Sequence, residues 1–204
     1  MYIPELFRVD DPATLFRFIE RYNFGTIVSG GAKPDATHLP FLVDAARGER
    51  GVLVAHFARA NAHWKTLDSL GDSLVIFRGP HCYLSPSWYD NKVNVPTWAY
   101  ATVHVRGRAC VMEDPSDIYP IVERLVAQHD QDWKISTAEP LMERFLQHIV
   151  GIEIPIESIE GKFKFNQNTS QADQLGVIGA LSDSDDQNER EVADIMQHNF
   201  TQIG

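Results

Sequence analysis

Cysteine is scarce in this chain, which has two thiols, Cys82 and Cys110, among 204 residues. The two cysteines form neither a C-x-x-C pair nor the evenly numbered, closely spaced set of a disulfide-stapled fold. Both lie in apolar, strand-like surroundings, which favours reduced thiols in the core. Because structural disulfides belong to oxidising compartments, this cysteine usage predicts a cytoplasmic protein.

Long hydrophobic runs are absent as well. No apolar stretch of the sequence approaches the roughly 20 residues that a membrane-spanning helix needs. The first residues, Met1-Tyr2-Ile3-Pro4-Glu5, lack the basic and then apolar pattern of a secretion signal. We therefore expect no membrane partner.

Positive charge is in short supply, because 18 Lys and Arg residues stand against 28 Asp and Glu residues, for a formal net charge of −10. Phosphate contacts dominate the affinity of proteins for nucleic acid, so this balance argues against non-specific DNA binding. No segment has the spacing of a helix-turn-helix or of a zinc finger. The alternative that a dimer carries a local basic patch is left open. DNA therefore stays among the candidate partners, although the net charge does not support it.

The motifs of several enzyme classes are also missing. The sequence contains no nucleophile elbow, Walker motif or dinucleotide fingerprint, and no carboxylate pair is set apart for acid–base chemistry. Its eight histidines include no H-E-x-x-H motif and no Cys/His quartet, so we expect no metal site. The pattern disfavours hydrolases and kinases and identifies no catalytic residue.

What the chain does have is an ordinary globular composition, with 44% hydrophobic and 23% charged residues, and a succession of short elements. Apolar alternation predicts strands, and helical spacing after Asp or Pro predicts helices. We expect strands over residues 24–29, 37–43, 52–57, 73–77, 81–84, 101–112 and 152–159. We expect helices over residues 12–22, 61–70, 115–128, 140–151 and 188–200. Short strands wrapped by a few helices predict a mainly β fold with peripheral helices, a small β-barrel.

The length suits one generous domain. We expect this domain to span residues 1–181. Residues 182–204 are expected to add an acidic linker and a C-terminal helix, which packs on the domain or on a partner subunit.

An anion site is predicted where the strand 52–57 gives way to the helix 61–70. The stretch His56-Phe57-Ala58-Arg59-Ala60-Asn61 lies at this junction, and the start of a helix offers free backbone N–H groups. Arg59 can add a bidentate contact to a phosphate, and Asn61 can cap the helix or donate to a ligand. The same pattern is also typical of a capped helix with an exposed arginine, so both interpretations stay open.

Aromatic rings and prolines are concentrated between residues 79 and 100. Rigid prolines and aromatic planes bordered by hydroxyls suit a flat ligand with a polar edge, although a Pro-rich loop on a barrel edge has the same composition. Further on, Lys162-Phe163-Lys164-Phe165-Asn166-Gln167-Asn168 places both lysines on one side of an extended segment. These lysines face either a ligand or solvent.

Together these segments resemble the PaiB-type family, described as FMN-binding negative transcriptional regulators. The resemblance runs nearly end to end and depends on an ordered set of motifs. They are Met1-Tyr2-Ile3-Pro4 with Phe7, Thr37-His38-Leu39-Pro40-Phe41, His56 to Asn61, Gly79 to Tyr89, Pro96-Thr97-Trp98-Ala99-Tyr100 and Lys162 to Asn168. Two positions depart from the family pattern: Ala99 stands where the family usually has Asn, and Asn166 where it more often has Ser.

The resemblance implies an FMN-binding split β-barrel, similar to pyridoxamine-phosphate oxidases and flavin reductases, and a homodimer with FMN at the subunit interface. It places four residues near the FMN phosphate and ribityl chain: His56, Ala58, Arg59 and Asn61. Three residues would border the isoalloxazine ring: His38, Leu39 and Pro40. Thr97 and Trp98 would lie along the flavin edge. Lys164, Gln167 and Asn168 would reach the site from either subunit.

Three functions follow from this resemblance. The first is a negative transcriptional regulator, or a sensor of redox state or of a metabolite, that acts through FMN. The second is an FMN-dependent oxidoreductase or flavin reductase, in which flavin N5 does the chemistry and the protein orients it. The third is a haem-binding protein on the same barrel, with a histidine as axial ligand.

Overall fold

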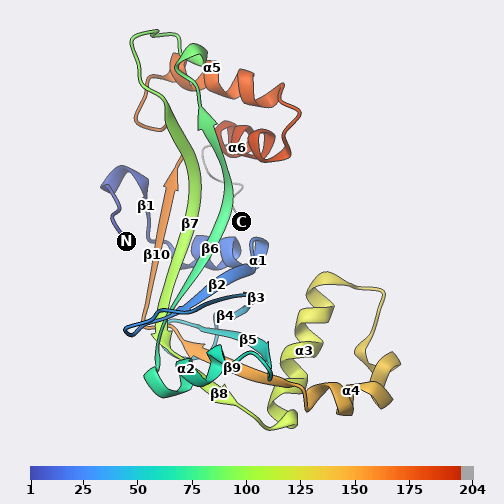
Figure 1. Ribbon diagram of the computed structural model, residues 1–204. Helices are drawn as coiled ribbons and strands as arrows, with labels where there is room; N and C mark the ends of the chain where they lie inside the picture. Colours follow the sequence, from blue (N-terminus) through green and yellow to red (C-terminus); the bar gives the residue numbers. More distant parts are fainter. Residues whose placement is uncertain (199–204) are drawn as a thin grey trace. The chain divides into compact units, whose positions relative to one another are not determined.

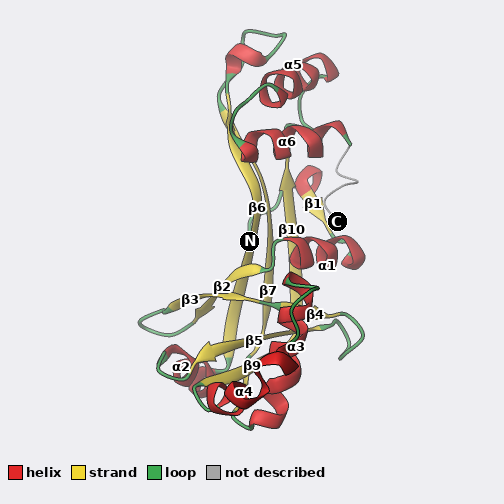
Figure 2. Ribbon diagram, turned by 90° about the vertical axis from the view of Figure 1, so that its right-hand side faces the viewer, coloured by secondary structure: helices red, strands yellow, loops and turns green. Residues whose placement is uncertain are grey.

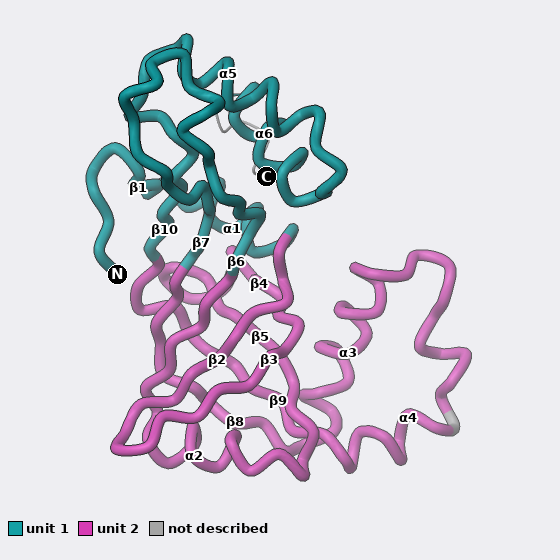
Figure 3. The backbone as a smooth tube through the Cα atoms, turned by 45° about the horizontal axis from the view of Figure 1, so that its top comes forward, with its two compact units in different colours: residues 1–21, 78–103, 160–204 teal, residues 22–77, 104–159 magenta. Residues whose placement is uncertain are grey.

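The computed structural model describes residues 1–198, without the side chain of Pro140, and Figure 1 shows its helices and strands. The chain divides into two compact units, coloured in Figure 3. Unit 1 contains Met1–Arg21, Arg78–Val103 and the chain from Glu160 onward, and unit 2 contains Tyr22–Phe77 and His104–Ile159. Three strands cross a boundary along their length: β6 (Asp72–Leu84), β7 (Thr97–Arg108) and β10 (Ser158–Lys164).

Unit 2 contains two antiparallel arrangements of strands. In the first, β2 (Phe24–Ser29) lies between β6 and β3 (Ala36–Pro40), with Thr26 opposite both Ile76 and His38. In the second, the order is β4 (Leu42–Asp44), β5 (Val52–Ala58), β9 (Ile149–Pro155) and β8 (Cys110–Met112). A ladder of seven residue pairs joins β5 to β9 and sets His56 opposite Gly151.

Four helices complete unit 2: α2 (His63–Leu70), α3 (Pro115–His129), the 3-10 helix η3 (Ile135–Ala138) and α4 (Glu139–Leu146). The face of β5 that carries Val52 and Val54 packs against Ile121 and Leu125 of α3. Successive side chains of a strand point to opposite faces, so His56 shares this α3-facing side of β5. The register of β5 thus directs one predicted site residue toward a helix.

Unit 1 contains β1 (Arg8–Val9), β10, β7 and β6 in this order. It also contains the 3-10 helices η1 (Glu5–Phe7) and η2 (Pro86–Trp88), and the helices α1 (Pro12–Arg21), α5 (Gln171–Ser182) and α6 (Gln187–Gln197). The α1 helix packs on β10, with the rings of Phe18 and Phe163 5.1 Å apart. The α5 and α6 helices lie side by side in both views (Figures 1 and 2).

The predicted class, mainly β with peripheral helices, is confirmed. Predicted helix starts are confirmed as well, because the carboxylate of Asp11 accepts from the Thr14 N–H at 2.9 Å and that of Asp114 accepts from the Ser116 N–H at 2.8 Å. Each carboxylate supplies the acceptor that the first turn of a helix lacks. The pKa of the Asp11 carboxyl group is lowered by the Thr14 hydroxyl and then by the Thr14 N–H group, and that of Asp114 by the Ser116 N–H group and then by the Ser116 hydroxyl.

Several predicted boundaries are wrong. The single strand over 37–43 is two strands, because the chain leaves β3 at Phe41, whose ring packs edge-on against Phe77, with centroids 5.5 Å apart. The separate strands over 73–77 and 81–84 are one strand, β6. The helix over 140–151 ends at Leu146, and its predicted apolar face is half exposed, since Leu141 and Phe145 are 54% and 58% exposed.

The C-terminal segment contains a helix that we did not expect. Residues 171–182 form α5, although the glycines at 176 and 179 lower the helix propensity of the segment. The α6 helix corresponds to the predicted C-terminal helix and ends at Gln197. Its predicted end at Phe200 lies outside the described residues, and the division of the chain at residue 181 stays a prediction.

The two cysteines differ in their surroundings. Cys82 is buried, and burial, with the carboxylates of Glu189 and Asp186, raises the pKa of its thiol to about 12. Cys110 is exposed on β8, so the prediction of a core thiol is wrong there, because this residue of the short strand faces solvent. Among residues 1–198, no helix has both the length and the apolar character needed to span a membrane.

Candidate functional site

The twelve residues predicted to contact FMN divide between the two units. Those in unit 2 are His38, Leu39, Pro40, His56, Ala58, Arg59 and Asn61. Those in unit 1 are Thr97, Trp98, Lys164, Gln167 and Asn168.

A hydrogen-bonded network occupies the turn between β5 and α2. The Asn61 Oδ1 accepts from the backbone N–H of His63 at 3.0 Å, and its Nδ2 donates to Thr37 Oγ1 at 3.1 Å. Thr37 Oγ1 in turn lies 2.9 Å from Nδ1 of His63. Although Ala62 holds the N-cap position of α2, Asn61 supplies the capping acceptor. The turn therefore holds an amide, a hydroxyl and an imidazole in fixed positions.

Arg59 lies at the same turn, and each nitrogen of its guanidinium makes one hydrogen bond within unit 2. Its Nε donates to the carbonyl of Gln147 at 3.0 Å and its Nη2 to the carbonyl of Ile149 at 3.2 Å. Its Nη1 pairs with the carboxylate of Glu113 at 2.5 Å. A phosphate that binds Arg59 would thus take the place of the Glu113 carboxylate, while the two carbonyls keep the guanidinium oriented.

Two imidazoles beside this turn contain buried nitrogen atoms without a hydrogen-bond partner among the described residues: Nδ1 of His56 and Nε2 of His63. Burial lowers the pKa of both histidines, and the carboxylate of Asp35 partly opposes this effect at His63. Both rings are therefore neutral at neutral pH. A neutral ring with an unpartnered nitrogen can donate to or accept from a ligand.

Acidification is expected to destabilise the fold through these two rings. In the folded protein the pKa values of His56 and His63 lie below the ordinary value of 6.5, so on acidification the unfolded chain binds protons first. The contribution of the two neutral rings to the free energy of unfolding is therefore complete above pH 6.5 and is lost as the pH falls through the folded pKa. Urea unfolding over a pH series measures the loss. The His56→Gln variant should show a shallower pH dependence than the wild type. His148→Gln, which changes an exposed side chain, should match the wild type, and an unchanged slope in His56→Gln would contradict the prediction.

The strand β3 presents His38 and Pro40 on one side and Leu39 on the other. His38 is exposed, its Nδ1 lies 2.8 Å from Thr26 Oγ1, and its ring stacks at 25° on Phe24 with centroids 6.4 Å apart. Phe24 is 68% exposed. Leu39 is buried, so a ligand along the His38 face would meet Phe24, which we did not predict as a site residue, before it met Leu39.

In unit 1, Thr97 and Lys164 meet, because the Lys164 ammonium donates to the hydroxyl of Thr97. Beside Thr97, the indole of Trp98 is 54% exposed and forms a cluster with two other rings. It stacks on His81 at 22° with centroids 6.5 Å apart and meets Tyr83 edge-on at 6.2 Å. Successive side chains of β7 point to opposite faces, so the Lys164–Thr97 pair and the indole of Trp98 lie on different sides of the strand. The indole offers the exposed aromatic plane that was predicted for a flat ligand.

Gln167 has a structural task in unit 1. Its Oε1 accepts from the backbone N–H of Phe165 at 2.7 Å, and its Nε2 donates to the carbonyl of Phe163 at 2.7 Å. These bonds hold a tight turn at Asn166, whose φ is 64°. Asn168 is exposed beyond the turn. Gln167 would therefore have to release backbone groups in order to contact a ligand, whereas Asn168 is accessible.

The departure at Ala99 lies on the inner side of β7. Ala99 is fully buried, whereas its neighbour Trp98 is exposed. Side chains alternate along a strand, so position 99 faces the core of the unit and not the aromatic cluster. The replacement of Asn by Ala therefore changes the core of unit 1 and leaves the exposed face of β7 unaltered.

The residues of both groups fit the chemistry of FMN. Guanidinium, amide and hydroxyl groups at the turn after β5 are phosphate donors, and the two unpartnered imidazole nitrogens there require a polar ligand or water. The ammonium and indole of unit 1 suit an isoalloxazine ring with its carbonyl edge. By contrast, no group of three or more His, Cys, Asp or Glu residues within residues 1–198 is placed to hold a metal ion.

The sequence did not single out four residues of these arrangements: Phe24, Thr37, His63 and Glu113. Thr37 belongs to a recognised motif, and His63 stands two residues after Asn61, so a polar side chain in or beside a motif was the available signal for these two. No sequence pattern pointed to Glu113, because it lies 54 positions from Arg59 in the chain and contacts it only in the folded protein.

Comparison with known proteins gives one family and one fold. A family model described as "Putative FMN-binding domain" matches residues 1–158. The "Protease synthase and sporulation protein PAI 2" of Bacillus subtilis is 34% identical in an alignment of 202 residues that covers 97% of each chain.

Two solved structures are similar to this fold at low sequence identity. The flavocytochrome Anf3 of Azotobacter vinelandii has a TM-score of 0.62 at 13% identity and covers 78% of this chain and 69% of its own. The FAD and heme binding protein of Mycobacterium smegmatis has a TM-score of 0.59 at 13% identity, over 82% of this chain and 78% of its own. These likenesses confirm the predicted split-barrel fold.

Proposed function

The chain belongs to the FMN-binding domain family, with FMN as its cofactor, and from this premise we propose that it is a negative transcriptional regulator that senses redox state or a metabolite through FMN. We propose further that it acts as a cytoplasmic homodimer. The observation that carries the proposal is the turn after β5, where Asn61, Thr37 and His63 form a polar network beside unpartnered imidazole nitrogens and where Arg59 pairs with Glu113.

We assign the phosphate and ribityl chain of FMN to this turn. Arg59 is the cation that binds the phosphate, and Asn61 and Thr37 donate to oxygens of the ribityl phosphate. His56 and Ala58 precede them on β5 and border the same part of the ligand. This assignment uses the two properties that phosphate recognition needs, a bidentate cation and oriented neutral donors.

We assign contacts with the isoalloxazine ring to exposed aromatic and cationic side chains. In unit 2 these are His38 and Pro40, together with Phe24, which stacks on His38. In unit 1 they are Trp98 and Lys164, together with Asn168, which is exposed. Bound flavin supplies reversible electron acceptance, and these residues bind the ring, orient it and exclude water from its faces.

The regulatory part of the proposal is supported by the relative of Bacillus subtilis, whose name describes a sporulation protein. The net charge of −10 disfavours a broad phosphate-binding surface. We therefore propose that the effect on transcription passes through a partner protein and that DNA is not contacted without one.

The test combines a spectrum, a titration and a binding assay. Purified protein should show flavin absorption bands or take up FMN with saturation, and it should elute as a dimer in size-exclusion chromatography with light scattering. A promoter fragment should not bind to the protein alone, with or without FMN. Rapid reduction of the bound flavin by NADH or NADPH would contradict the sensor proposal and favour an oxidoreductase. A Soret band in the absorption spectrum would favour a haem-binding protein.

A further inference from the structure

Two large apolar side chains of unit 2 project from α4 into solvent. Leu141 and Phe145 are 54% and 58% exposed, and residues four apart are neighbours on one side of a helix. Other residues attach α4 to its unit, since Met142 and Leu146 are buried in one cluster with Ile118 of α3. Figure 3 shows α4 at the edge of unit 2. The helix therefore has a second apolar side, which is left open to solvent.

The polar residues that border this apolar pair are basic. Arg144 follows Leu141 by three positions and His148 follows Phe145 by three, so both lie on the same side of the helix as the pair. Both are exposed. The backbone N–H of His148 donates to the carbonyl of Phe145 at 2.9 Å, which extends the helical turn to His148. We call Leu141, Arg144, Phe145 and His148 the α4 surface.

The acidic residues of α4 lie on another side of the helix. Glu139 precedes Leu141 by two positions and Glu143 follows it by two, and two positions on a helix correspond to a rotation of about 200°. Both carboxylates therefore lie opposite to Leu141. The charge of the α4 surface is positive, although the chain as a whole has a net charge of −10.

The small size of the α4 surface limits what it can bind. With eight residues, α4 is about 12 Å long, whereas a stable interface between proteins buries about 1,200–2,000 Å². A second copy of the chain that met this helix alone would bury too little area. Helices that bind membrane surfaces have a long apolar face and several basic residues. A short amphipathic segment, by contrast, docks through a few apolar anchors at helical spacing.

The chain that leaves α4 reaches the turn after β5. The backbone N–H of Arg59 donates to the carbonyl of His148 at 2.7 Å, and its Nε donates to the carbonyl of Gln147 at 3.0 Å. The residues that end the α4 surface therefore also hold the guanidinium that we assign to the FMN phosphate. A partner bound to α4 would lie next to the proposed flavin site without using its side chains.

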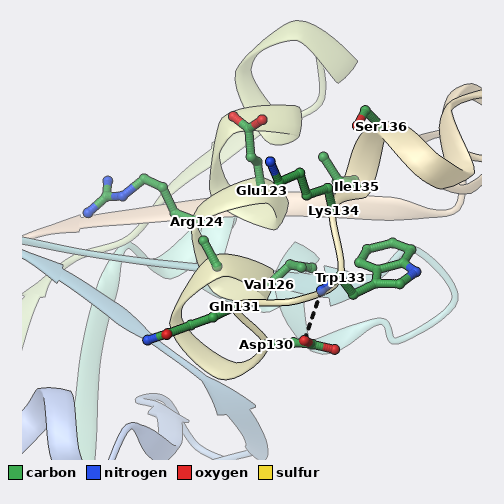
Figure 4. A pocket seen from close by; sticks show the side chains of 10 residues that line it. Glu123, Arg124, Val126, Asp130, Gln131, Trp133, Lys134, Ile135 and Ser136 are labelled. Atoms are coloured by element: carbon green, nitrogen blue, oxygen red, sulfur yellow. Dashed lines mark hydrogen bonds between the residues drawn. The ribbon is translucent and has the colours of Figure 1, made fainter.

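A recess of unit 2 precedes α4 in the chain and differs from the α4 surface in charge. Its volume is about 580 Å³, and its lining runs from the C-terminal half of α3 to Ser136 (Figure 4). Its charged side chains are Glu123 and Asp130 on the acidic side and Arg124 and Lys134 on the basic side. Because these charges cancel, the recess favours a partner of neither sign.

We propose that the α4 surface binds a short amphipathic segment of a partner protein, in which acidic residues flank apolar anchors. The anchors cover Leu141 and Phe145, and a carboxylate of the segment pairs with Arg144. This inference rests on the proposed function and deepens it, because a regulator that acts through a partner protein needs a surface for that partner.

Fluorescence anisotropy of a labelled peptide tests the proposal. The probe is a synthetic amphipathic peptide with Leu at helical spacing and Glu and Ala between, and its counterpart carries Lys in place of each Glu. The net charge of −10 would by itself favour the Lys peptide, whereas the α4 surface should bind the Glu peptide with saturation. Tighter binding of the Lys peptide, or no saturable binding of the Glu peptide, would overturn the proposal.

Substitutions of exposed side chains test the assigned contacts. Phe145→Ser removes an apolar anchor, so the affinity for the Glu peptide should fall about tenfold. Arg144→Gln should lower it about twofold to fivefold, and salt should weaken this variant less than the wild type. The controls are Leu175→Ser, at a leucine of α5 that is 61% exposed, and Arg17→Gln, at an exposed arginine of α1. Losses in the controls as large as those on α4 would show that binding is non-specific.

Three further outcomes would assign the observations to another site or occupant. Loss of peptide binding in Trp133→Ala but not in Phe145→Ser would place the peptide in the recess. A dimer that becomes a monomer in Phe145→Ser, measured by light scattering, would show that a second copy covers α4. Binding to vesicles that contain phosphatidylglycerol, lost in Phe145→Ser, would assign the surface to a membrane. Each of these results would overturn the proposal.

An FMN titration distinguishes failure of this inference from failure of the proposed function. Leu141 and Phe145 are exposed to solvent and lie outside the turn after β5, so Phe145→Ser should bind FMN as the wild type does. If the wild type takes up FMN and does not bind the Glu peptide, this inference fails alone. If it binds the peptide at the α4 surface and takes up no FMN, the proposed function fails and the α4 surface stands.

Discussion

Replacement of Gly176 by alanine is expected to lower the free energy of unfolding by about 2–3 kcal/mol, the usual cost of overpacking a well-filled contact. Gly176 lies in α5, where a Cβ would come within 3.0 Å of the backbone carbonyl oxygen of Trp88. A backbone carbonyl cannot turn aside as a flexible side chain can. The helix would therefore have to move away from η2.

Such a movement would also strain neighbouring contacts of α5. The carboxylate of Asp173 accepts from the backbone N–H of Asn91 at 3.0 Å, and this bond, first among several, lowers the pKa of the Asp173 carboxyl group. A shift of the helix away from η2 would lengthen the bond. We thus expect a lower melting temperature together with faster proteolysis of the segment after residue 166.

Gly179 provides the matched control on the same helix. A Cβ at this position would meet nothing within 4 Å, and alanine in an exposed helix interior is more stable than glycine by about 0.5–1 kcal/mol. Gly179→Ala should therefore raise the melting temperature slightly while Gly176→Ala lowers it. Equal effects of the two variants would show that helix propensity, and not the contact with Trp88, governs this helix.

Arg59→Ala is expected to weaken FMN binding by about tenfold to a hundredfold, because a hydrogen bond with a charged group contributes roughly 1.5–3 kcal/mol. The loss would appear in an FMN titration followed by flavin fluorescence. Arg59 also bonds to the carbonyls of Gln147 and Ile149, so the alanine variant loses contacts between β5 and the start of β9. Its melting temperature must therefore be measured beside its affinity.

Glu113→Gln separates the two tasks of Arg59. If the phosphate replaces the Glu113 carboxylate, removal of that charge should strengthen FMN binding up to about fivefold, the range of a partly exposed ion pair. If Arg59 has a structural task alone, the same variant should lower stability and leave FMN binding unchanged. A tighter Kd in Glu113→Gln together with a weaker one in Arg59→Ala is the expected result, and an unchanged Kd in both would refute the assignment.

The sequence determined the local features of this protein. These features depend on residues that are neighbours in sequence. They are the helix caps Asp11 and Asp114, the alternation of Lys162 and Phe163, and the strand that ends at Ala58. The ordered motifs also determined the family and the cofactor. These features were predictable because each one depends on residues that are close in sequence.

The tertiary structure decided the features that depend on distant residues. The strand over 37–43 changes its partner at Phe41 because that ring packs on Phe77, and the burial of Leu39 but not His38 follows from which side of β3 meets the core. Glu113 engages Arg59 because β9 and the end of β8 bring them together. Local pattern contains none of this information, since packing sets the partner of each strand and each charge.

The same division holds for the candidate sites. The sequence alone determined that Arg59 and Asn61 carry chemistry at the turn after β5, because a guanidinium and an amide stand there two positions apart, whereas the hydroxyl of Thr37 joins them only in the folded chain. Only the tertiary structure decided that His56 lies on the α3-facing side of β5 and that its Nδ1 is buried without a partner among the described residues. The burial of a ring depends on every side chain packed around it and on no single motif.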